Sequence, residues 1–541
     1  MRLGIDFGTT RVVVAAADRG NYPVLQFEAP DGGVRDWFPP LVAARGDERR
    51  YGWEAWSLQG EPGWTVVRSM KRLLSDAGPQ TEIELGDAAV PLRTLLTEMT
   101  SELRRSLLEA STLPTSEGPL EVQLGVPANA NTNQRFLTAE AFRWGGFEVL
   151  GLLNEPSAAA IEFAHVNPPS SPEQERFLLV YDLGGGTFDA SLLSLRGSSQ
   201  DVLATEGVPT LGGDDFDDLL AEFALQEVGL SESEREALTQ AEWFLLHEEC
   251  RQKKEALRPT SRRITLELDT VREGLGSVSV RISDFYDRCR PAVDETLHAV
   301  TDLLGRCGFE ASGQRPSDEA RIDTVYVAGG GSELPLVPRG LREQFGRRVR
   351  RSAYGRSSTA IGLAVQADAT AGYVLRDRFT RYFGVWRESD CGRDIVFDPL
   401  FARDTALPAN GDEPLLIARS YAPAHNVGHF RYLECSHLDE AGRPDGDITL
   451  WDDILFPFDP ALEQGADLAS TVVERSPGVE GQWIEERYTC DSSGRLAVTI
   501  SNLRSEYQHA FKLGRWAASP RRVRPGGRAS RASKRRARGA S

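Results

Sequence analysis

The sequence has little of several residue types that mark particular protein classes. Its six cysteines are scattered and form no Cys-x-x-Cys pair, which argues against a zinc site and a disulfide framework. No stretch approaches about 18 uncharged apolar residues, so no transmembrane helix is expected. An apolar strand is expected from residue 3, which leaves no room for a signal peptide. These absences predict a cytoplasmic protein with reduced thiols and no membrane partner.

Charge is also unevenly distributed. The net charge is −18, but residues 516–541 contain nine Arg or Lys and no acid. The remaining residues therefore carry −27, the −18 of the chain less the nine charges of this tail. Such an acidic body is a poor nucleic-acid binder, and the Arg-rich tail, expected to be disordered, offers at most weak contact with nucleic acid.

The stretch LVYDLGGGTFDASLL at 179–193 has the features of a phosphate-binding turn. A buried strand is expected to end at Asp182, and Gly184, Gly185 and Gly186 then allow a tight turn into a second strand. Backbone N–H groups that no side chain covers can hold an anion, and Asp182 and Asp189 could hold a hydrated cation beside it. Taken alone, a plain glycine-rich hairpin explains the stretch equally well.

One further stretch repeats this layout, and a third contains a similar glycine turn. LGIDFGTTRVVVAAA at 3–17 contains a strand, Asp6, a turn of Gly8, Thr9 and Thr10, and another strand. Two such hairpins predict two related lobes, each offering one phosphate loop to a nucleotide between them. A third turn, Gly329, Gly330 and Gly331, lies between an expected strand and an expected helix within 323–346, although an ordinary strand-to-helix turn would look the same.

Alternating strands and helices predict an α/β fold for the first two thirds of the chain. Helical spacing of leucines predicts a helix over 92–107, and NEPSAAAIEFA at 154–164 predicts an Ala-rich helix with proline near its start. Residues 379–515 instead show many short alternating segments, such as those flanking a turn at 491–494, which is typical of an all-β unit.

Together the motifs IDFGTT (5–10), KRLL (71–74), NEPSAAAIEFA, DLGGGTFDASLL (182–193), LGGDDFD (211–217) and VAGGGSELP (327–335) resemble the nucleotide-binding domain of the seventy-kilodalton heat-shock (DnaK-type) chaperones. The resemblance covers residues 1–368 and implies an actin-like two-lobed ATPase domain that binds ATP or ADP with Mg²⁺. Lobe I would span about 1–166 and lobe II about 175–368. A linker at 369–378, a peptide-binding-like β-sandwich at 379–515 and the disordered tail at 516–541 would follow; RDTALP (403–408) resembles the start of that sandwich.

The resemblance also implies roles for individual residues. Lys71 and Glu155 match positions that orient or deprotonate the attacking water, and Asp182 and Thr187 complete the catalytic set. Asp6, Asp182, Asp189 and Asp215 would surround hydrated Mg²⁺ and neighbouring monovalent cations such as K⁺. The positions expected to hold the nucleotide are Gly8, Thr9, Thr10, Gly184, Gly185, Gly186, Gly212, Gly213, Lys254, Arg258, Gly329, Gly330 and Gly331.

The chain departs from the family at the base end of the nucleotide. Two arginines that lie on the adenine in the family correspond to Glu255 and Glu333 here, and Arg258 is a candidate replacement. We therefore expect the residues that bind the phosphates to be intact and the residues that bind the base to be altered. Other departures concern coupling to the β-sandwich: Thr132 replaces an aspartate, Arg376 and Asp377 interrupt the apolar linker, and no helical lid is expected after residue 515.

The leading hypothesis is a divergent, lidless chaperone that hydrolyses ATP and binds unfolded or partly folded polypeptides. A J-domain co-chaperone and a nucleotide-exchange factor are candidate partners. One alternative is a nucleotide-sensing or constitutively binding scaffold that does not hydrolyse ATP, which the altered base grip and linker favour. Another is an actin-fold sugar or acetate kinase, which the β-unit and LGGDDFD make a poorer explanation.

Overall fold

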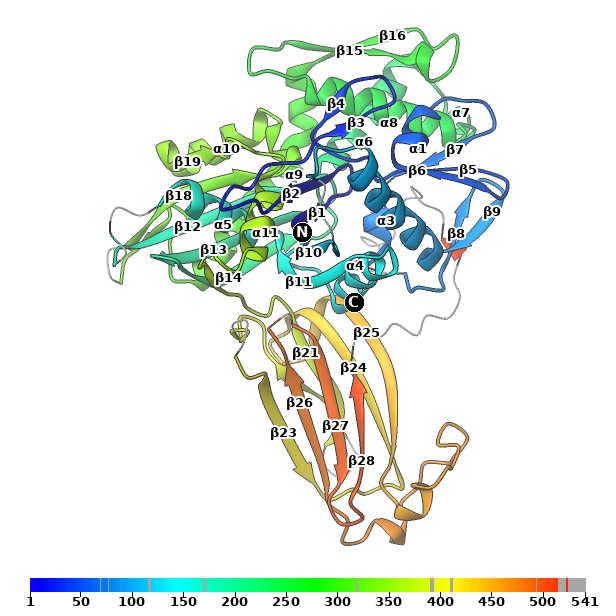
Figure 1. Cartoon of the computed structure of the whole chain (residues 1–541), viewed down its shortest axis with the longest axis vertical. Coiled ribbons are helices and arrows are strands. Elements are labelled where there is room, and N and C mark those ends of the chain that lie inside the picture. The colour runs from blue at the N-terminus through cyan, green and yellow to red at the C-terminus, as the bar shows by residue number, and fades with distance from the viewer. Residues whose placement is uncertain are drawn as a thin grey trace.

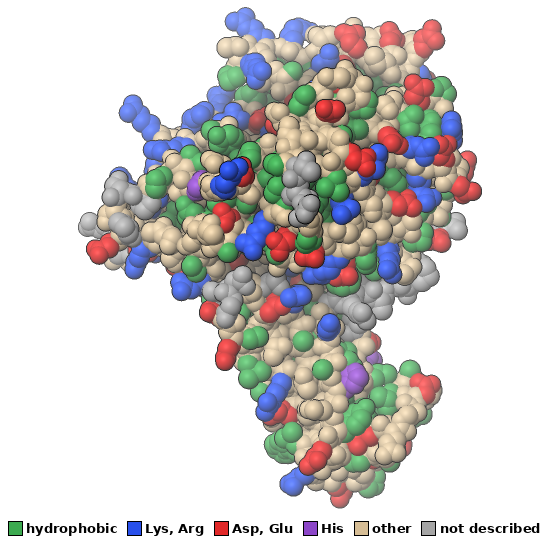
Figure 2. Space-filling view, in the orientation of Figure 1, with side chains coloured by type: hydrophobic (Ala, Val, Ile, Leu, Met, Phe, Trp, Pro, Cys, Tyr) green, Lys and Arg blue, Asp and Glu red, His purple; other side chains and the backbone are tan. Residues whose placement is uncertain are grey.

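The computed structural model describes residues 1–68, 70–75, 77–114, 118–168, 171, 173–317, 320–389, 394–408, 412–492, 494–513 and 522–523. Two α/β lobes lie together, and an elongated β-unit extends from them (Figure 1). On the face shown in Figure 2, acidic and basic side chains are interspersed over both parts. No helix within the described ranges is long and apolar enough to cross a membrane.

Lobe I is built on a four-stranded sheet in the order β11-β10-β1-β2. Strand β1 runs parallel to β10 and antiparallel to β2, whose five residues are all buried. The expected helix over 92–107 is confirmed as α3, which buries its leucines against this lobe's core. The elements are β1 (Arg2–Phe7), β2 (Val12–Ala16), β3 (Phe27–Glu28), β4 (Val34–Arg35), β5 (Val42–Arg45), β6 (Glu48–Tyr51), α1 (Gly52–Ser57), β7 (Thr65–Val67), α2 (Met70–Leu73), β8 (Glu82–Leu85), β9 (Ala88–Pro91), α3 (Leu92–Glu109), β10 (Glu121–Val126), α4 (Thr132–Trp144), β11 (Glu148–Asn154) and α5 (Glu155–Val166).

Lobe II repeats the plan around a larger sheet in the order β17-β18-β12-β13-β14-β20, with β19 beside β18. Here β12 is antiparallel to β13 and parallel to β18, as β1 is to β2 and β10. The two-hairpin repeat predicted from the sequence is therefore confirmed. The elements are β12 (Glu175–Leu183), β13 (Phe188–Arg196), β14 (Ser199–Val208), α6 (Gly213–Val228), α7 (Glu232–Glu236), α8 (Gln240–Glu255), β15 (Arg263–Glu267), η1 (Leu268–Thr270), β16 (Ser277–Arg281), α9 (Ile282–Arg306), β17 (Gln314–Arg315), β18 (Ala320–Ala328), η2 (Gly330–Glu333), α10 (Leu336–Phe345), η3 (Gly346–Arg348), β19 (Val349–Arg351), α11 (Ser358–Ala367) and β20 (Val374–Arg376).

The C-terminal unit is all β, as its alternating sequence predicts. Two four-stranded antiparallel sheets, β22-β21-β24-β25 and β23-β26-β27-β28, enclose an aromatic-rich core. The elements are β21 (Tyr382–Ser389), β22 (Asp394–Phe401), β23 (Leu415–Tyr421), β24 (Val427–Leu438), β25 (Pro444–Pro457), η5 (Pro460–Leu462), η6 (Pro477–Val479), β26 (Ile484–Cys490), β27 (Leu496–Asn502) and β28 (Tyr507–Lys512).

Three expectations concern segments outside these units. The expected linker contributes β20, which pairs in parallel with β14 and thereby extends the lobe II sheet. The expected disordered tail, 516–541, lies outside the described residues except for β29 (Arg522–Val523), which pairs with β8 and so is not disordered at those two residues. The five cysteines within the described residues are free, as expected; Cys391 is not among them.

Helix α11 crosses α5 at a point where only glycine fits. A Cβ atom at Gly362 of α11 would lie 1.8 Å from the carbonyl oxygen of Ala158 in α5. A Cβ atom at Gly4 of β1 would lie 2.2 Å from the backbone nitrogen of Ala364 in α11. Because backbone atoms cannot move aside as flexible side chains do, this close packing fixes α5 and α11 against the lobe I sheet.

We expect Gly362→Ala to lower the free energy of unfolding by about 1–3 kcal/mol, because overpacking outweighs the gain in helix propensity. The matched control is Gly340→Ala in α10, where the nearest atom to a new Cβ, Leu297 Cδ1, lies 3.4 Å away. The control should be neutral or stabilising by at most about 1 kcal/mol. Calorimetric unfolding of both variants checks this, and equal midpoints would contradict it.

Candidate functional site

The two hairpin turns predicted from the sequence face one another across the lobes. A Cβ atom at Gly186 would lie 2.8 Å from Thr9 Oγ1, and one at Gly185 would lie 3.2 Å from Thr10 Oγ1. The turn itself is closed by a hydrogen bond from the Gly184 N–H to the Thr187 carbonyl, 3.0 Å. Glycine at 185 and 186 therefore allows the two turns to approach closely.

Beside these turns lies a buried ion pair between lysine and glutamate. Lys71 of α2 donates a hydrogen bond from Nζ to Glu155 Oε1 at 2.5 Å, and both side chains are almost fully buried. Burial alone would lower the pKa of Lys71, but the charges of Glu155 and Asp6 outweigh it and raise the pKa. A lysine that would ordinarily lie in solvent is thus kept charged inside the protein.

Three aspartates surround this pair. Burial, reinforced by the charge of Glu155, raises the pKa of Asp6 and of Asp189 to about 7 each, while Lys71 opposes the shift. The pKa of Asp182 is raised well above its ordinary value by burial, Glu155 and the other two aspartates. One lysine does not balance four clustered carboxylates, so the set suits a cation. Among the described residues, no three His, Cys, Asp or Glu side chains lie close enough to ligate a metal directly.

Two more glycine turns pack against the first lobe II turn. The Gly213 N–H donates to the Gly184 carbonyl at 2.9 Å, and a Cβ atom at Gly331 would lie 2.6 Å from that same oxygen. Lys254 of α8 reaches the Gly213 carbonyl at 2.5 Å and Asp217 at 2.7 Å. Burial raises the pKa of Asp217 to about 7, although Lys254 opposes the shift. The predicted turns at 184–187, 212–213 and 329–331 thus form one continuous floor.

Of two further predicted residues, Asp215 lies against these turns and Arg258 is exposed. Asp215 is in the first turn of α6, where its carboxylate accepts the Gly212 N–H at 2.8 Å and lies 3.7 Å from Arg72. Arg258 follows the end of α8 and is exposed, and its N–H donates to Ser261 Oγ. This placement brings Arg258 against neither Glu255 nor Glu333, and its expected contact with the base stays a prediction.

The compensating residues are arginines that were not predicted from the sequence. Arg11, directly after the first turn, donates to Glu255 Oε2 at 2.6 Å, and Arg356 donates to the same oxygen at 3.1 Å and from Nε to Glu333 at 3.0 Å. Burial alone would raise the pKa of Glu255, but Arg11, Arg251 and Arg356 lower it to about 2. The sequence did hold one signal of these contacts: glutamates stand at two positions where arginines were expected, and buried glutamates need basic partners nearby.

Two further arginines of lobe I cross to acids of lobe II. Arg68 lies 2.6 Å from Glu248 of α8, and Arg72 lies 3.3 Å from Asp214 of α6. With Arg11–Glu255 and Arg72–Asp215, these residues make four ion-pair contacts between the lobes along the meeting line of the turns. The facing surfaces of the lobes are therefore complementary in charge.

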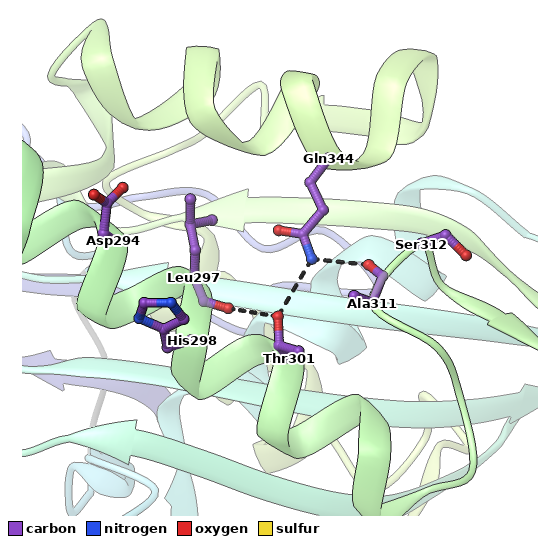
Figure 3. Close-up of a pocket in the computed structure, with 7 residues that line it drawn as sticks. All are labelled: Asp294, Leu297, His298, Thr301, Ala311, Ser312 and Gln344. Carbon is purple, nitrogen blue, oxygen red and sulfur yellow. Dashed lines mark hydrogen bonds between the residues drawn. The ribbon is translucent and has the colours of Figure 1, made fainter.

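A pocket of about 460 Å³ lies on lobe II between α9 and α10 (Figure 3). Its Gln344 donates to the Ala311 carbonyl at 2.8 Å and lies 3.5 Å from Thr301, whose hydroxyl donates to the Leu297 carbonyl. None of its lining residues belongs to the predicted site. We assign the pocket no role.

The β-unit is joined to both lobes by polar contacts. Arg403, in the RDTALP segment, donates to the Thr205 carbonyl and to Glu206 in β14, both at 2.8 Å. On lobe I, the Thr132 N–H donates to Glu434 of β24 at 2.8 Å. The position at which the sequence lacks an expected aspartate therefore still contacts the β-unit, through its backbone.

The linker is held by a chain of hydrogen bonds that begins in lobe I. Arg135 donates to Asn154 Oδ1 at 2.5 Å, and the Asn154 amide donates to Asp377 at 2.8 Å. Burial raises the pKa of Asp377. Asp377, expected to interrupt the linker, instead connects it to the start of α5, the helix that also carries Glu155.

The two similar lobes, with paired glycine turns meeting at a buried cluster of one lysine and four carboxylates, define the actin-like ATPase fold. A family model described as Hsp70 protein matches residues 115–380. Chaperone protein HscA of Klebsiella pneumoniae (strain 342) is 33% identical over 384 residues, which cover 68% of this chain and 58% of the relative. A heat shock protein of Pyricularia oryzae is 29% identical over 440 residues, covering 75% of this chain and 68% of the relative.

The chain belongs to the Hsp70 family. The resemblance inferred from the motifs is thereby confirmed. The matched region spans less than two thirds of the length of HscA, and the same holds for the HscA homolog of Vibrio vulnificus, which is 33% identical over 396 residues.

Helix α5 also carries a buried acid at the junction of the lobes. Glu162 is 1% exposed, accepts a hydrogen bond from Tyr326 of β18, and has its pKa raised to about 7 by burial. The folded protein therefore holds this proton more tightly than the unfolded chain does. Stability from this group is full below the unfolded pKa and falls as the pH rises to about 7.

We expect Glu162→Gln to be more stable than the wild type by about 2 kcal/mol at pH 8 and nearly equal to it at pH 5. Glutamine keeps the shape of the side chain and removes the buried charge. Unfolding by urea at both pH values measures the difference. The control is Glu109→Gln, at an exposed position of α3, and its free energy of unfolding should show no pH-dependent gain. A gain in stability at pH 8 in the control and not in Glu162→Gln would refute the raised pKa of Glu162.

Proposed function

We propose that this chain is an ATP-dependent chaperone that hydrolyses ATP between its lobes and binds unfolded polypeptide through residues 379–515. The observation that carries the proposal is the charged Lys71–Glu155 pair buried beside two facing phosphate-type turns. A buried ion pair is costly unless the surroundings use it, and hydrolysis of a phosphoanhydride needs charge and position at this place. The family's chaperones support the polypeptide-binding part.

Each group has a separate task in the proposed reaction. The backbone N–H groups of the turns at 8–10 and 184–187 bind phosphate oxygens and hold the chain of phosphates straight. Lys71 positions the attacking water, and Glu155 accepts its proton as the bond to the γ-phosphorus forms. Asp6, Asp182 and Asp189 would hold hydrated magnesium, which supplies neutralising charge on the phosphates. Thr187, hydrogen-bonded to Asp189, orders that carboxylate.

Single-turnover hydrolysis of ATP with magnesium and potassium tests the reaction. We expect slow hydrolysis in the wild type and a loss of about 100-fold or more in Lys71→Ala, because the water loses its positioning charge. Lys253→Ala is the matched control, since Lys253 lies on α8 outside the cluster and pairs only loosely with Glu249 at 3.4 Å.

The same experiment separates hydrolysis from binding. Wild-type ATP binding without hydrolysis would refute the enzyme and leave the nucleotide-sensing scaffold, the second candidate, which the altered base end favours. Absence of both binding and hydrolysis at millimolar ATP would refute the nucleotide site altogether. Thr187→Ala should retain binding while slowing hydrolysis.

Coupling between the lobes and the β-unit is the second part of the proposal. It is supported by the contacts of Arg403 with β14 and by the chain from Arg135 to Asp377. Because β14 follows the strand that carries Asp189, a change at the phosphate turns can reach Arg403 through a single sheet. J-domain and nucleotide-exchange partners would act on these same contacts.

We expect Arg403→Ala to keep ATP hydrolysis but to abolish the effect of nucleotide on polypeptide binding. In the wild type, ATP should change the dissociation rate of a permanently unfolded probe, reduced and carboxymethylated lactalbumin, by about tenfold relative to ADP. Arg431→Ala, at an exposed position of β24, is the control and should behave as the wild type. Equal ATP effects in both variants would refute this role of Arg403.

A further inference from the structure

An arginine–glutamate cluster, comprising Arg11, Arg251, Glu255, Glu333 and Arg356, lies at one end of the row of glycine turns. Arg356 is its centre, because its guanidinium is hydrogen-bonded to Glu255 through Nη1 and to Glu333 through Nε and Nη2. Arg251 adds a contact to the other oxygen of Glu255 at 3.1 Å. Both oxygens of Glu255 and Oε2 of Glu333 thus accept hydrogen bonds from arginines.

The cluster lies where a bound nucleotide would place its nucleoside. The reacting end of the phosphates is marked by Lys71 and Glu155. From there, contacts run through Thr9 and Gly186 to Gly213 and Lys254, and Glu255 is the next residue of α8. The Gly329 N–H also donates to the Gly355 carbonyl at 3.1 Å, which ties the loop that carries Arg356 to the third glycine turn.

The chemistry of the cluster does not suit recognition of one particular base. Strong discrimination requires fixed polar groups that are left unpaired by the wrong base. Here both oxygens of Glu255 and Oε2 of Glu333 accept hydrogen bonds from arginines, and Glu333 Oε1 lies 4.0 Å from Arg351. Arg356 is held along its edge by both carboxylates and its side chain is 30% exposed. Stacking on a guanidinium plane accepts any base, because every base has a flat π-surface.

We propose that the site takes nucleoside triphosphates with little discrimination among bases, binding them through the phosphates and stacking the base on Arg356. This inference rests on the proposed function, since it concerns the ligand of the same site. The ligand class is therefore a magnesium nucleoside triphosphate, purine or pyrimidine. Arg356 thereby determines the specificity of the site: it holds the base by stacking, and the hydrogen-bonding edge of the base is not read.

Titration calorimetry of the full chain with the magnesium complexes of ATP, GTP, CTP and inorganic tripolyphosphate tests the inference. We expect the three nucleotides to bind within about threefold of one another, and tripolyphosphate more weakly because it has no base to stack. A preference of about tenfold or more for any single base overturns the inference and leaves the proposed ATPase standing. Failure of all four to bind overturns the proposed function and this inference together.

A pair of variants separates stacking from a merely structural ion pair. Arg356→Ala should weaken all three nucleotides by a similar factor of about threefold to tenfold and leave tripolyphosphate unchanged. Arg351→Ala is the matched control, because Arg351 lies 4.0 Å from Glu333 on the outer side of the cluster without contacting Glu255. Equal losses for tripolyphosphate and nucleotides in Arg356→Ala, or unchanged nucleotide binding in that variant, would refute a stacking role.

Discussion

The structure depends on the electrostatic constraint at the meeting point of the two hairpin turns. Four carboxylates and one lysine are buried there, and burial, reinforced by the charge of Glu155, raises the pKa of Asp6 and of Asp189 to about 7. Such a cluster is costly in a folded protein unless a cation or a reaction makes use of it. The surrounding architecture can be understood from this constraint. Each of the two sheets places an aspartate near the end of a strand, and α5 places Glu155 between the two aspartates.

The close contact of the lobes follows from the same geometry. Only glycine at 185 and 186 lets the turns approach Thr9 and Thr10, so the lobes meet backbone to side chain with little intervening volume. Further along the turns the lobes are joined by charge. Arg11, Arg68 and Arg72 reach from lobe I to acids of lobe II. An apolar contact adds to these ion pairs, because Ala159, Ala160 and Phe163 of α5 pack against strands of the lobe II sheet.

Much of this could be predicted from the sequence, for physical reasons. The pattern of strand, aspartate and glycine turn indicated the repeat and the location of the site because it occurs twice, whereas a single copy would also fit an ordinary hairpin. The helix at α3 followed from its leucine spacing. The arginine–glutamate cluster could not be predicted, because Arg11 and Arg356 are far from Glu255 in sequence and only the fold brings them together. Arg258 was a reasonable candidate by proximity in the chain, but helix α8 ends before it and leaves it exposed.

The alternation of inward-facing and outward-facing residues along a strand indicates which polar side chains are buried, and composition alone does not. In β26, Glu486 shares the inward face with Ile484 and Tyr488, and it is fully buried, held by two hydrogen bonds from Arg387. An acid in phase with core residues therefore signalled a buried ion pair in the β-unit. Asp377 is the corresponding case in the linker: it looked like an interruption, yet Asn154 binds it at the start of the helix that carries Glu155. Both acids at apolar positions are thus held by hydrogen bonds, Glu486 within the β-unit and Asp377 between the linker and lobe I.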